Sequence, residues 1–552
     1  MPRALAPLTS RLLGGAGLEK RLGLLDAVGE WPAWHEHARG VLEKSPDWPR
    51  LRSLLERIVA EKLPVLVYGD YDVDGTFASF MLFRYLRSQG VPGNIFLPSR
   101  FRHGYGLDAG IIASAPGQGY KVLLALDCGT ANHAEIAQAT AAGLEAAIID
   151  HHTAKDELPA VPVLNPHLAP GMPPFCAAGL VYFAISALNG GIRAGLAGDE
   201  TELAGLATIA DVVPLIPDNW VMAHQSLLLI PESANLGLAE LTKASGLHGL
   251  TRLTAQQAAF QLVPRLNSAG RMRSPRLVLD LLGARDVQEA RRAAAQLEQL
   301  NSARKSEAEQ VFRKALLQVA MQGEQPAYAL VDENWHIGVI GIVAAKVAEQ
   351  AGRPVALFTA DPRGGGLLSG SVRSGGFVDV IEALTQAGSE LQSFGGHRDA
   401  AGAKLDPARL EQFREAWAAA VKAMTAREQP VSEEYESFTL ADLTSGFEAD
   451  LWALAPFGAK YPAPRAVLEG LSVQRVSYMG GEKTHLSIVA GDGERQVRIA
   501  AFNKSHLFDR LRPGTPLRAL VDIDTDNWNN ELTISLRLVE LADEDAQEGR
   551  TG

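Results

Sequence analysis

The sequence is poor in cysteine, with only Cys128 and Cys176 among 552 residues. Two thiols cannot build a disulfide framework, so a reducing, cytoplasmic location is expected. The chain also lacks an apolar run long enough to cross a bilayer, and its first twenty residues lack the apolar stretch of a secretory signal. These absences argue against a membrane partner. A chain of this length is too long for one compact core, which predicts several domains.

Basic charge is in deficit over the whole chain but not everywhere along it. The formal net charge is −12, which argues against nonspecific nucleic-acid binding by the molecule as a whole. Residues 75–107 and 241–279, however, contain no acidic residue. These windows are either chance gaps or basic walls for an anionic substrate, which binds through counterion release. Their basic residues include Arg84, Arg87, Arg100, Arg102, His103, Lys243, Arg252, Arg265, Arg271, Arg273 and Arg276.

Short apolar segments in the first half of the chain predict strands that are buried on both faces. These segments are Leu63–Tyr68, Lys121–Leu126 and Leu144–Ile149. Polar residues and then a helical stretch, such as Thr76–Gln89 or Asn132–Ala142, follow the strands. Alternating strands and helices indicate an α/β domain with a parallel sheet and helices on its faces.

The second half of the chain changes character twice. Residues Arg285–Met321 contain strong helix formers, no Pro and no Gly, and charge on most sides, which predicts a long helix between domains. A second α/β stretch runs from Pro326 to about Thr425. Beyond it, the alternation of Leu532–Leu538 and the hairpin turn Gly491–Gly493 predict a small β-barrel, for which an OB-type fold fits best.

The predicted organisation therefore has six parts. They are an N-terminal segment (1–47), a parallel-sheet domain (48–280), a connecting long helix (281–322), a second α/β domain (323–428), an OB-like β-barrel (429–543) and an acidic tail (544–552).

The first predicted strand ends in three alternating carboxylates, Asp70, Asp72 and Asp74, followed by Gly75. An EF-hand calcium loop is excluded, because its twelfth position needs a Glu where this chain has Met81 and because a strand precedes the motif. A phosphate loop of the Walker type is excluded because no Lys follows Gly75. The motif alone is compatible with a solvated acidic turn or with a metal site.

The other predicted strands also end in polar residues. The second ends at Asp127, the third at Asp150-His151-His152, and Asp211 closes a helical stretch. Because ligands bind outside the carboxyl ends of parallel strands, we expect these side chains to meet at one edge of the sheet. Carboxylates mixed with imidazole suit Mn²⁺ or Mg²⁺, and so many anions favour two ions about 3.5–4 Å apart.

Six motifs, in this order, resemble the DHH phosphoesterase superfamily, and within it the RecJ family of single-strand-specific 5′→3′ DNA exonucleases of DNA repair and recombination. They are Gly69–Gly75, Leu126–Gly129, Ile149–His152, Ala210–Pro214, Pro264–Arg271 and Gly395–Gly402. The resemblance covers the chain from about Trp48 to the β-barrel. It identifies the second α/β stretch as similar to the DHHA1 domain.

The resemblance implies two divalent ions, Mn²⁺ or Mg²⁺. The first ion is implied to bind Asp74, Asp127, His151 and Asp211, and the second Asp72 and Asp127, with Asp70 completing its shell.

The resemblance also implies roles for His152 and Asp150, and it shows one departure from the family at Tyr68. His152 is implied either to face the scissile phosphate or to orient its neighbour, and Asp150 is implied to support the site by fixing an imidazole tautomer. Many members of the superfamily carry a His where this chain has Tyr68. Asp70 is therefore expected to take the place of that His among the ligands of the second ion.

The substrate-binding residues are expected in Gly-rich or basic motifs. Gly-rich stretches are often only tight turns, but Arg and His inside them favour a phosphate site. The stretch Arg100–Gly106 interleaves basic and aromatic residues, as stacking sites for single strands do. The candidates are Arg100, Arg102, Tyr105, Arg265, Asn267, Arg271, Ser371, Arg373, Gly396 and His397.

These features predict a metal-dependent exonuclease that hydrolyses single-stranded DNA from its 5′ end. A phosphodiesterase for short oligonucleotides or cyclic dinucleotides is an alternative with the same site, although the long helix and the barrel argue against it. A non-enzymatic single-strand-binding scaffold is the third hypothesis. Beyond single-stranded DNA, the resemblance implies a single-strand-binding protein and a helicase as partners.

Overall fold

The computed structural model describes residues 5–12, 23, 26, 34–104, 106–153, 157–189, 200–425, 435–480, 483–528 and 530–542. The predicted site residue Tyr105 and the predicted acidic tail lie outside these residues. Within the described part, no helix is both long and apolar enough to pass through a bilayer.

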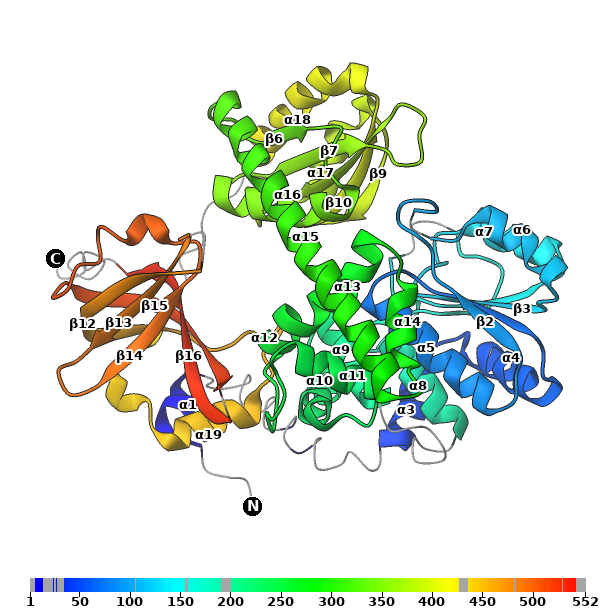
Figure 1. Cartoon of the computed structure of the whole chain (residues 1–552), viewed down its shortest axis with the longest axis horizontal. Coiled ribbons are helices and arrows are strands. Elements are labelled where there is room, and N and C mark those ends of the chain that lie inside the picture. The colour runs from blue at the N-terminus through cyan, green and yellow to red at the C-terminus, as the bar shows by residue number, and fades with distance from the viewer. Residues whose placement is uncertain are drawn as a thin grey trace.

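The first domain is built on a sheet whose strands all run parallel, as the sequence predicts (Figure 1). Its strand order is β2-β1-β3-β4-β5. The central strands β1 and β3 are wholly buried and consist mainly of Val, Leu and Ala. Burial on both faces explains why they are continuous apolar segments in the sequence. The strands are β1 (Val65–Tyr68), β2 (Gly93–Phe96), β3 (Val122–Leu126), β4 (Glu145–Ile149) and β5 (Val163–Leu164).

Helices cover both faces of this sheet and continue into a helical half-domain. One face packs in a core with α4 (Trp48–Glu61), α5 (Val73–Ser88) and α8 (Ala177–Asn189). The other packs with α6 (Ala109–Ser114) and α7 (His133–Ala141). The remaining helices of this domain are α3 (Trp34–Leu42), α9 (Glu200–Ala210), α10 (Pro217–Leu229), α11 (Leu236–Ala244), α12 (Ala255–Gln257), α13 (Val263–Met272) and α14 (Arg276–Leu282).

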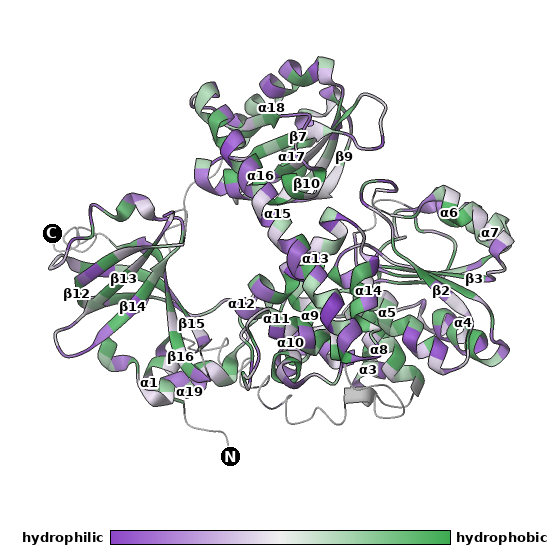
Figure 2. Cartoon of the chain, viewed as in Figure 1, coloured by the Kyte–Doolittle hydropathy of each residue, from purple (hydrophilic) through white to green (hydrophobic). Residues whose placement is uncertain are grey.

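The predicted long helix is α15, which spans Val287–Gln322 and joins the first domain to the second (Figure 1). Asp286 caps it by accepting a hydrogen bond from the Glu289 N–H. Its N-terminal half buries Leu297 in the core of the first domain, and its C-terminal half buries Phe312 in the core of the second. Figure 2 shows hydrophilic and hydrophobic residues along its length. The helix therefore belongs to two cores and fixes the spacing between them.

The second domain has a mixed sheet in the order β6-β7-β8-β10-β9, in which only β6 and β7 pair in parallel. Helix α16 (Ile337–Ala351) packs against this sheet and against α15. The other elements are β6 (Tyr328–Val331), β7 (Val355–Ala360), β8 (Leu368–Arg373), β9 (Leu391–His397), β10 (Ala400–Leu405), α17 (Val380–Gln386) and α18 (Leu410–Thr425).

The C-terminal part is a β-barrel, closed by the antiparallel pairing of β12 with β15. The predicted hairpin is confirmed, because β13 and β14 pair antiparallel around the turn in which Asp492 accepts hydrogen bonds from Glu494 and Arg495. The strands are β11 (Ser437–Phe438), β12 (Arg465–Met479), β13 (His485–Gly491), β14 (Gln496–Ala501), β15 (Pro516–Trp528) and β16 (Glu531–Leu541). Helix α19 (Ser445–Leu454) comes between β11 and β12 in the sequence.

Buried polar contacts fasten the barrel to the first domain. The Trp220 indole N–H donates to the carbonyls of Leu454 and Pro456, and the Arg252 guanidinium donates to the carbonyl of Ala455. Burial, together with the charge of Arg252, lowers the pKa of His224 at this junction to about 4, so His224 is neutral near pH 7.

Two further contacts bring distant parts of the chain together. Helix α1 (Pro7–Leu12) lies against α19, where the buried Asp450 carboxylate accepts hydrogen bonds from the Ala6 N–H and the Thr9 hydroxyl. The barrel also reaches the second domain, through a 2.7 Å hydrogen bond from Asn503 to Glu349 on α16. The barrel thus contacts both α/β domains.

The role of α15 can be tested by shortening one buried side chain. Leu297→Ala removes a fully buried group from the first core, so we expect the free energy of unfolding to fall by about 2–5 kcal/mol. Leu317→Ala on the same helix is the control, because this side chain is 66% exposed and its loss is expected to change stability by less than about 0.5 kcal/mol. Thermal and denaturant unfolding measure both; equal losses would contradict the described packing.

Candidate active site

The turn after β1 places the first three carboxylates. Asp72 caps α5, its Oδ1 accepting a hydrogen bond of 3.1 Å from the Gly75 N–H. Gly75 is required there, because a Cβ atom on it would come within 2.5 Å of the Asp70 backbone nitrogen. The turn therefore folds back on itself and holds Asp70, Asp72 and Asp74 at the carboxyl end of β1.

Asp74 is fixed by the first turn of α8. Its two carboxylate oxygens accept hydrogen bonds of 2.7 Å from the backbone N–H groups of Ala177 and Ala178. A helix N-terminus interacts favourably with a carboxylate, so this contact orients Asp74.

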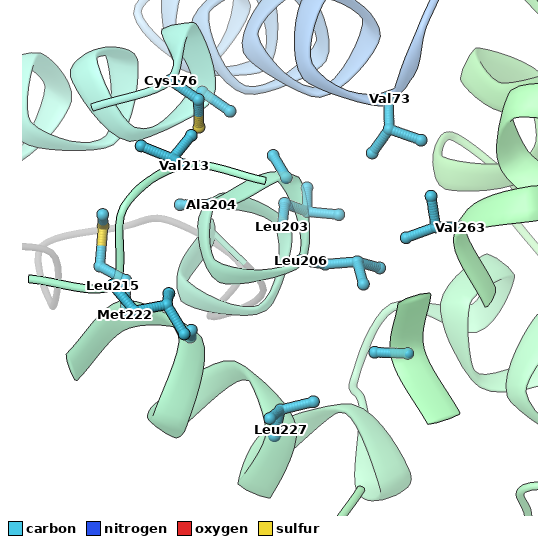
Figure 3. Packing of buried hydrophobic residues seen from close by; sticks show 14 of the residues in the cluster. Val73, Cys176, Leu203, Ala204, Leu206, Val213, Leu215, Met222, Leu227 and Val263 are labelled. Carbon is cyan, nitrogen blue, oxygen red and sulfur yellow. The ribbon is translucent and has the colours of Figure 1, made fainter. Parts of the chain in front are cut away.

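Asn267, which the sequence predicts to bind substrate, contacts this same turn in the structure. Its Oδ1 accepts a 3.1 Å hydrogen bond from the Val73 N–H at the start of α5. Val73, Val263 and Leu206 belong to one buried hydrophobic core, and Figure 3 shows Val73 and Val263 on the same side of Leu206. Helix α13 therefore supports the acidic turn through both polar and apolar contacts.

The other strand ends deliver their side chains to the same place. Asp127 follows β3 with a left-handed backbone (φ 59°) and donates its N–H to the carbonyl of Ile149, which ties it to β4. The His151 Nε2 atom lies 3.1 Å from Asp127 Oδ1, 3.5 Å from Asp211 Oδ2 and 3.7 Å from Asp74 Oδ2. The predicted convergence at one sheet edge is therefore present.

Donor atoms in three overlapping groups lie within 4.8 Å of one another. The groups are Asp70 with Asp72 and Asp127; Asp74 with His151 and Asp211; and Asp127 with His151 and His152. The Oδ1 atoms of Asp70 and Asp127 are buried and accept no hydrogen bond within the described residues. Buried carboxylate oxygens that accept no hydrogen bond and lie close to imidazole nitrogen fit a hard divalent cation such as Mn²⁺ or Mg²⁺.

The electrostatics of this cluster lead to the same conclusion. Burial raises the pKa of Asp70, Asp72, Asp127 and Asp211, and repulsion from neighbouring carboxylates raises each of them further. Without added positive charge, these groups can ionise together only at a high cost in free energy. Two divalent cations would remove that cost.

Asp150 organises the histidine pair. It is buried and accepts hydrogen bonds from the His151 N–H (2.7 Å), the Thr130 N–H (3.1 Å) and the His152 Nδ1 atom (2.8 Å). Burial opposes its charge, but the hydrogen bond and charge of His152 hold the pKa of Asp150 well below its usual range. Burial lowers the pKa of His152, but the hydrogen bond and the negative charge of Asp150 outweigh this effect and raise that pKa to about 9. This geometry leaves His152 Nε2 as the nitrogen that does not face Asp150.

A cleft of about 820 Å³ separates the histidine pair from the second domain. The rings of His152 and His397 are stacked across it, with centroids 6.4 Å apart. Gly396 precedes His397 where β9 and β10 approach so closely that a Cβ would come within 2.3 Å of the Ala400 carbonyl. The residues that line the cleft include Arg100, Asn132, His152, Arg363, Gly396, His397, Arg398 and Lys404.

A cluster of arginines borders the metal-binding groups. Burial, followed by the charge of Arg100, lowers the pKa of Arg271 to about 10, and the same two causes lower that of Arg373. The Arg373 guanidinium donates to the Ser371 hydroxyl (3.0 Å), and Arg100 lies over the Tyr71 ring. Mutually repelling, partly buried guanidinium groups form a site that an anion stabilises.

Other predicted residues are placed differently. Arg102 is exposed and is not among the residues that line the cleft. Arg265 forms an ion pair with Glu298 on α15 and donates to the carbonyl of Gln261. Tyr68 is buried, its hydroxyl bonded to the carbonyl of Gly106 and the N–H of Asp108, so it offers no ligand in place of the family's histidine.

Two basic residues near the arginines are absent from the predicted set. Arg304 projects from α15 and its charge contributes to lowering the pKa of Arg271. His336 caps α16, its Nδ1 accepting from the Gly338 N–H, and its ring lies 5.5 Å from that of Phe101. The feature that marks this face of α15 is the fully buried Asn301, one turn before Arg304. Its burial is a property of the structure, so the sequence alone does not reveal it.

Three family descriptions match the chain in the expected order. Residues 64–210 match "DHH family, N-terminal domain", residues 323–423 match "DHHA1 domain", and residues 436–540 match "RecJ OB domain". The predicted fold class is confirmed by these matches together with the sheet and barrel described above. The exact domain boundaries stay predictions.

Curated relatives align over most of the chain. It is 31% identical over 503 residues to the single-stranded-DNA-specific exonuclease RecJ of Thermus thermophilus, covering 90% of this chain and 71% of that protein. It is 29% identical over 495 residues to the RecJ of Bacillus subtilis, covering 88% of this chain. The aligned region spans only 62% of the length of the Bacillus protein.

Solved structures give a similar result. The Thermus thermophilus RecJ crystallised with Mn²⁺ superimposes with a TM-score of 0.78 at 27% identity, covering 100% of this chain and 80% of that one. An exonuclease RecJ bound to manganese gives a TM-score of 0.60 at 32% identity, covering 73% of this chain and 98% of that one.

The carboxylate cluster generates a test that needs no substrate. In the presence of chelator, Asp127→Asn is expected to unfold at a higher temperature than the wild type, because it removes one of several repelling buried charges. Saturating Mn²⁺ should reverse the order. An ion at one hundred times its Kd stabilises the wild type by about 2.7 kcal/mol, and the variant lacks a shared ligand.

Differential scanning calorimetry with and without Mn²⁺ measures this reversal. Asp280→Asn is the control, since its side chain is 58% exposed on α14 and its loss should leave both melting temperatures nearly unchanged. Equal stabilisation of the wild type and Asp127→Asn by Mn²⁺ would contradict the assignment of this cluster as the metal centre.

Proposed function

The chain belongs to the RecJ family, and on that premise we propose that it is a metal-dependent exonuclease that hydrolyses single-stranded DNA from the 5′ end. The observation that carries the proposal is the joint placement of two features. A carboxylate and imidazole cluster that fits divalent cations lies at the sheet edge, and a cluster of arginines borders it. The first suits phosphodiester hydrolysis, and the second suits a terminal phosphate.

We propose the metal ligands that the family resemblance implies. Asp74, Asp127, His151 and Asp211 would hold one ion, and Asp72, Asp127 and Asp70 would hold the other. When bound, two Mn²⁺ or Mg²⁺ ions supply a water of lowered pKa and stabilise the charge that develops on the phosphate.

The protein's own groups do the positioning. The α8 N-terminus and Asn267 hold the acidic turn in place, and Asp150 fixes the orientation of the His151 and His152 rings. His152, whose Nδ1 atom bonds to Asp150, lines the cleft and would present Nε2 to the scissile phosphate. The cleft between the two α/β domains confines the strand, so that single strands are selected by shape and no base is read.

The 5′ phosphate is held by the basic groups that flank the metal centre. Arg373 and Ser371 on β8 approach it from the second domain, and Arg100 and Arg271 approach it from the first. His397 closes the cleft opposite His152. Arg102, Arg265 and Tyr105 remain predicted substrate contacts. A single-strand-binding protein and a helicase remain predicted partners on the basis of family resemblance.

The direction of digestion is tested with strands labelled at either end. In Mn²⁺, a 5′ label should appear at once as a mononucleotide, whereas a 3′-labelled strand should shorten stepwise. Asp127→Ala should abolish both reactions, because it removes a ligand shared by the two ions, while the Kd for single-stranded DNA stays within about threefold. Clear preference for a dinucleotide over the long strand would favour the short-oligonucleotide alternative, and normal turnover by Asp127→Ala would refute the metal assignment.

The phosphate site is tested separately at Arg373. Arg373→Ala removes charge-assisted hydrogen bonds, each worth about 1.5–3 kcal/mol, so KM for a 5′-phosphorylated strand should rise about 10- to 100-fold. The preference for a 5′ phosphate over a 5′ hydroxyl should shrink by the same factor. Arg353→Ala, an exposed position at the end of α16, is the matched control. A loss that is equal for both kinds of 5′ end would show that Arg373 does not contact the phosphate.

A further inference from the structure

Two apolar side chains are exposed on the side of the first domain that faces the barrel. Phe260 is 73% exposed and Val212 is 70% exposed. Single exposed apolar residues are common, but these two line one cavity of about 670 Å³ between the first domain and the barrel. Val212 also directly follows the proposed metal ligand Asp211. The pair therefore needs an explanation that involves the site.

The backbone at Val212 is strained. Its φ angle is 54°, a left-handed conformation that a β-branched residue rarely adopts. The turn ends α9, with the Val213 N–H bonded to the carbonyl of Thr208. This conformation directs Asp211 toward His151 and leaves Val212 on the cavity wall. Strain of this kind persists where the surrounding structure uses it.

The exposure of Phe260 has its own cause in the sequence. Residues Ala258–Leu262 form a π-helical turn, in which the Val263 N–H bonds to the carbonyl of Ala258. Pro264 has no N–H to donate to the carbonyl of Phe260 four residues earlier, and its ring would clash with that carbonyl in a regular helix. The wider turn resolves the clash and leaves Phe260 on the surface. Such π-turns are frequent at functional sites.

The turn that carries Phe260 is fastened to the barrel. The Gln256 side-chain amide donates to Asp524 (2.7 Å), and that of Gln257 donates to the carbonyl of Asn527 (2.8 Å). Both bonds join α12 to β15. The start of this turn is thus fixed to the barrel before any ligand arrives, which lowers the entropy cost of binding.

The chemistry of the cavity favours a flat, uncharged ligand. The two arginines on its wall are paired, Arg465 with Asp522 at 2.7 Å and Arg537 with Asp524 at 3.6 Å. Its charges therefore balance and do not attract a phosphate, while its remaining wall is largely apolar. A volume of about 670 Å³ lies within the 300–1,000 Å³ of typical small-ligand sites.

We propose that Phe260 and Val212 form a stacking site for a nucleobase of the single strand, on the 3′ side of the bond that is cut. The inference rests on the proposed function. The 5′ phosphate lies with the arginines near the second domain, so a strand crossing the metal centre continues past Asp211 into this cavity. Stacking on Phe260 tolerates any base and holds the strand in register for the next cut.

Binding of single abasic substrates tests the site without turnover. A 5′-phosphorylated strand carries one abasic residue at each successive position, and Kd is measured by anisotropy in the Asp127→Ala background with Mn²⁺ present. We expect one or two adjacent positions, on the 3′ side of the first bond, to weaken binding about five- to tenfold, the lower end of base–aromatic stacking. Adding Phe260→Ala should weaken binding of the intact strand by the same factor and abolish the abasic penalty at those positions only.

Phe260→Trp and Met321→Ala complete the design. The Trp variant keeps a stacking surface and should restore the penalty, whereas Met321, 86% exposed at the far end of α15, should have no effect. An abasic penalty that persists unchanged in Phe260→Ala, or a strand profile without any penalty, would overturn the proposal. Absence of hydrolysis by the wild type would instead contradict the proposed function, because this binding experiment does not depend on cutting.

Discussion

The repulsion among carboxylates gathered at one sheet edge is the constraint on which the rest of the structure depends. Asp70, Asp72, Asp127 and Asp211 all have pKa values raised by burial and by one another. A fold keeps such a cluster only if cations offset it and if rigid elements hold it together. Three parallel strands supply the rigidity, because their carboxyl ends cannot separate without breaking the sheet. The α8 N-terminus adds two fixed hydrogen bonds to Asp74.

The same constraint explains how the parts of the chain are joined. Helix α13 supports the acidic turn through Asn267, and it packs on α15, which carries the second domain. The barrel is anchored on the opposite side by Trp220, Arg252 and α12. Domain placement and site geometry thus share contacts. A single strand of DNA bound at the proposed metal centre would lie between the second domain and the barrel.

Much of this arrangement could be predicted from the sequence. The parallel strands were evident because continuous Val, Leu and Ala runs mark strands buried on both faces, and the strand ends then determined where Asp127 and His151 had to lie. The hairpin at Asp492 and the span of α15 were equally accessible, since both depend on local turn or helix preference. The resemblance to DHH phosphoesterases added the role of Asp211, which ends a helix and not a strand.

What could not be predicted depends on contacts distant in sequence. The sequence predicts that Asn267 binds substrate because it lies in a basic window, whereas in the structure its side-chain oxygen accepts a hydrogen bond from the Val73 N–H in the first turn of α5. Arg265 was expected there for the same reason, and it pairs with Glu298. The sequence does not single out Arg304, because nothing in a charged helix distinguishes the face that turns toward Arg271. Only tertiary packing decides which polar side chain supports a neighbour and which remains available to a ligand.

The central claim is that this cluster holds two divalent cations. Anomalous diffraction from crystals grown with Mn²⁺, together with equilibrium dialysis, tests it most directly. We expect two Mn²⁺ ions for each chain, with Asp127 as their shared ligand, His151 on one ion and Asp72 on the other. A single ion, or ions bound away from Asp127, would contradict it.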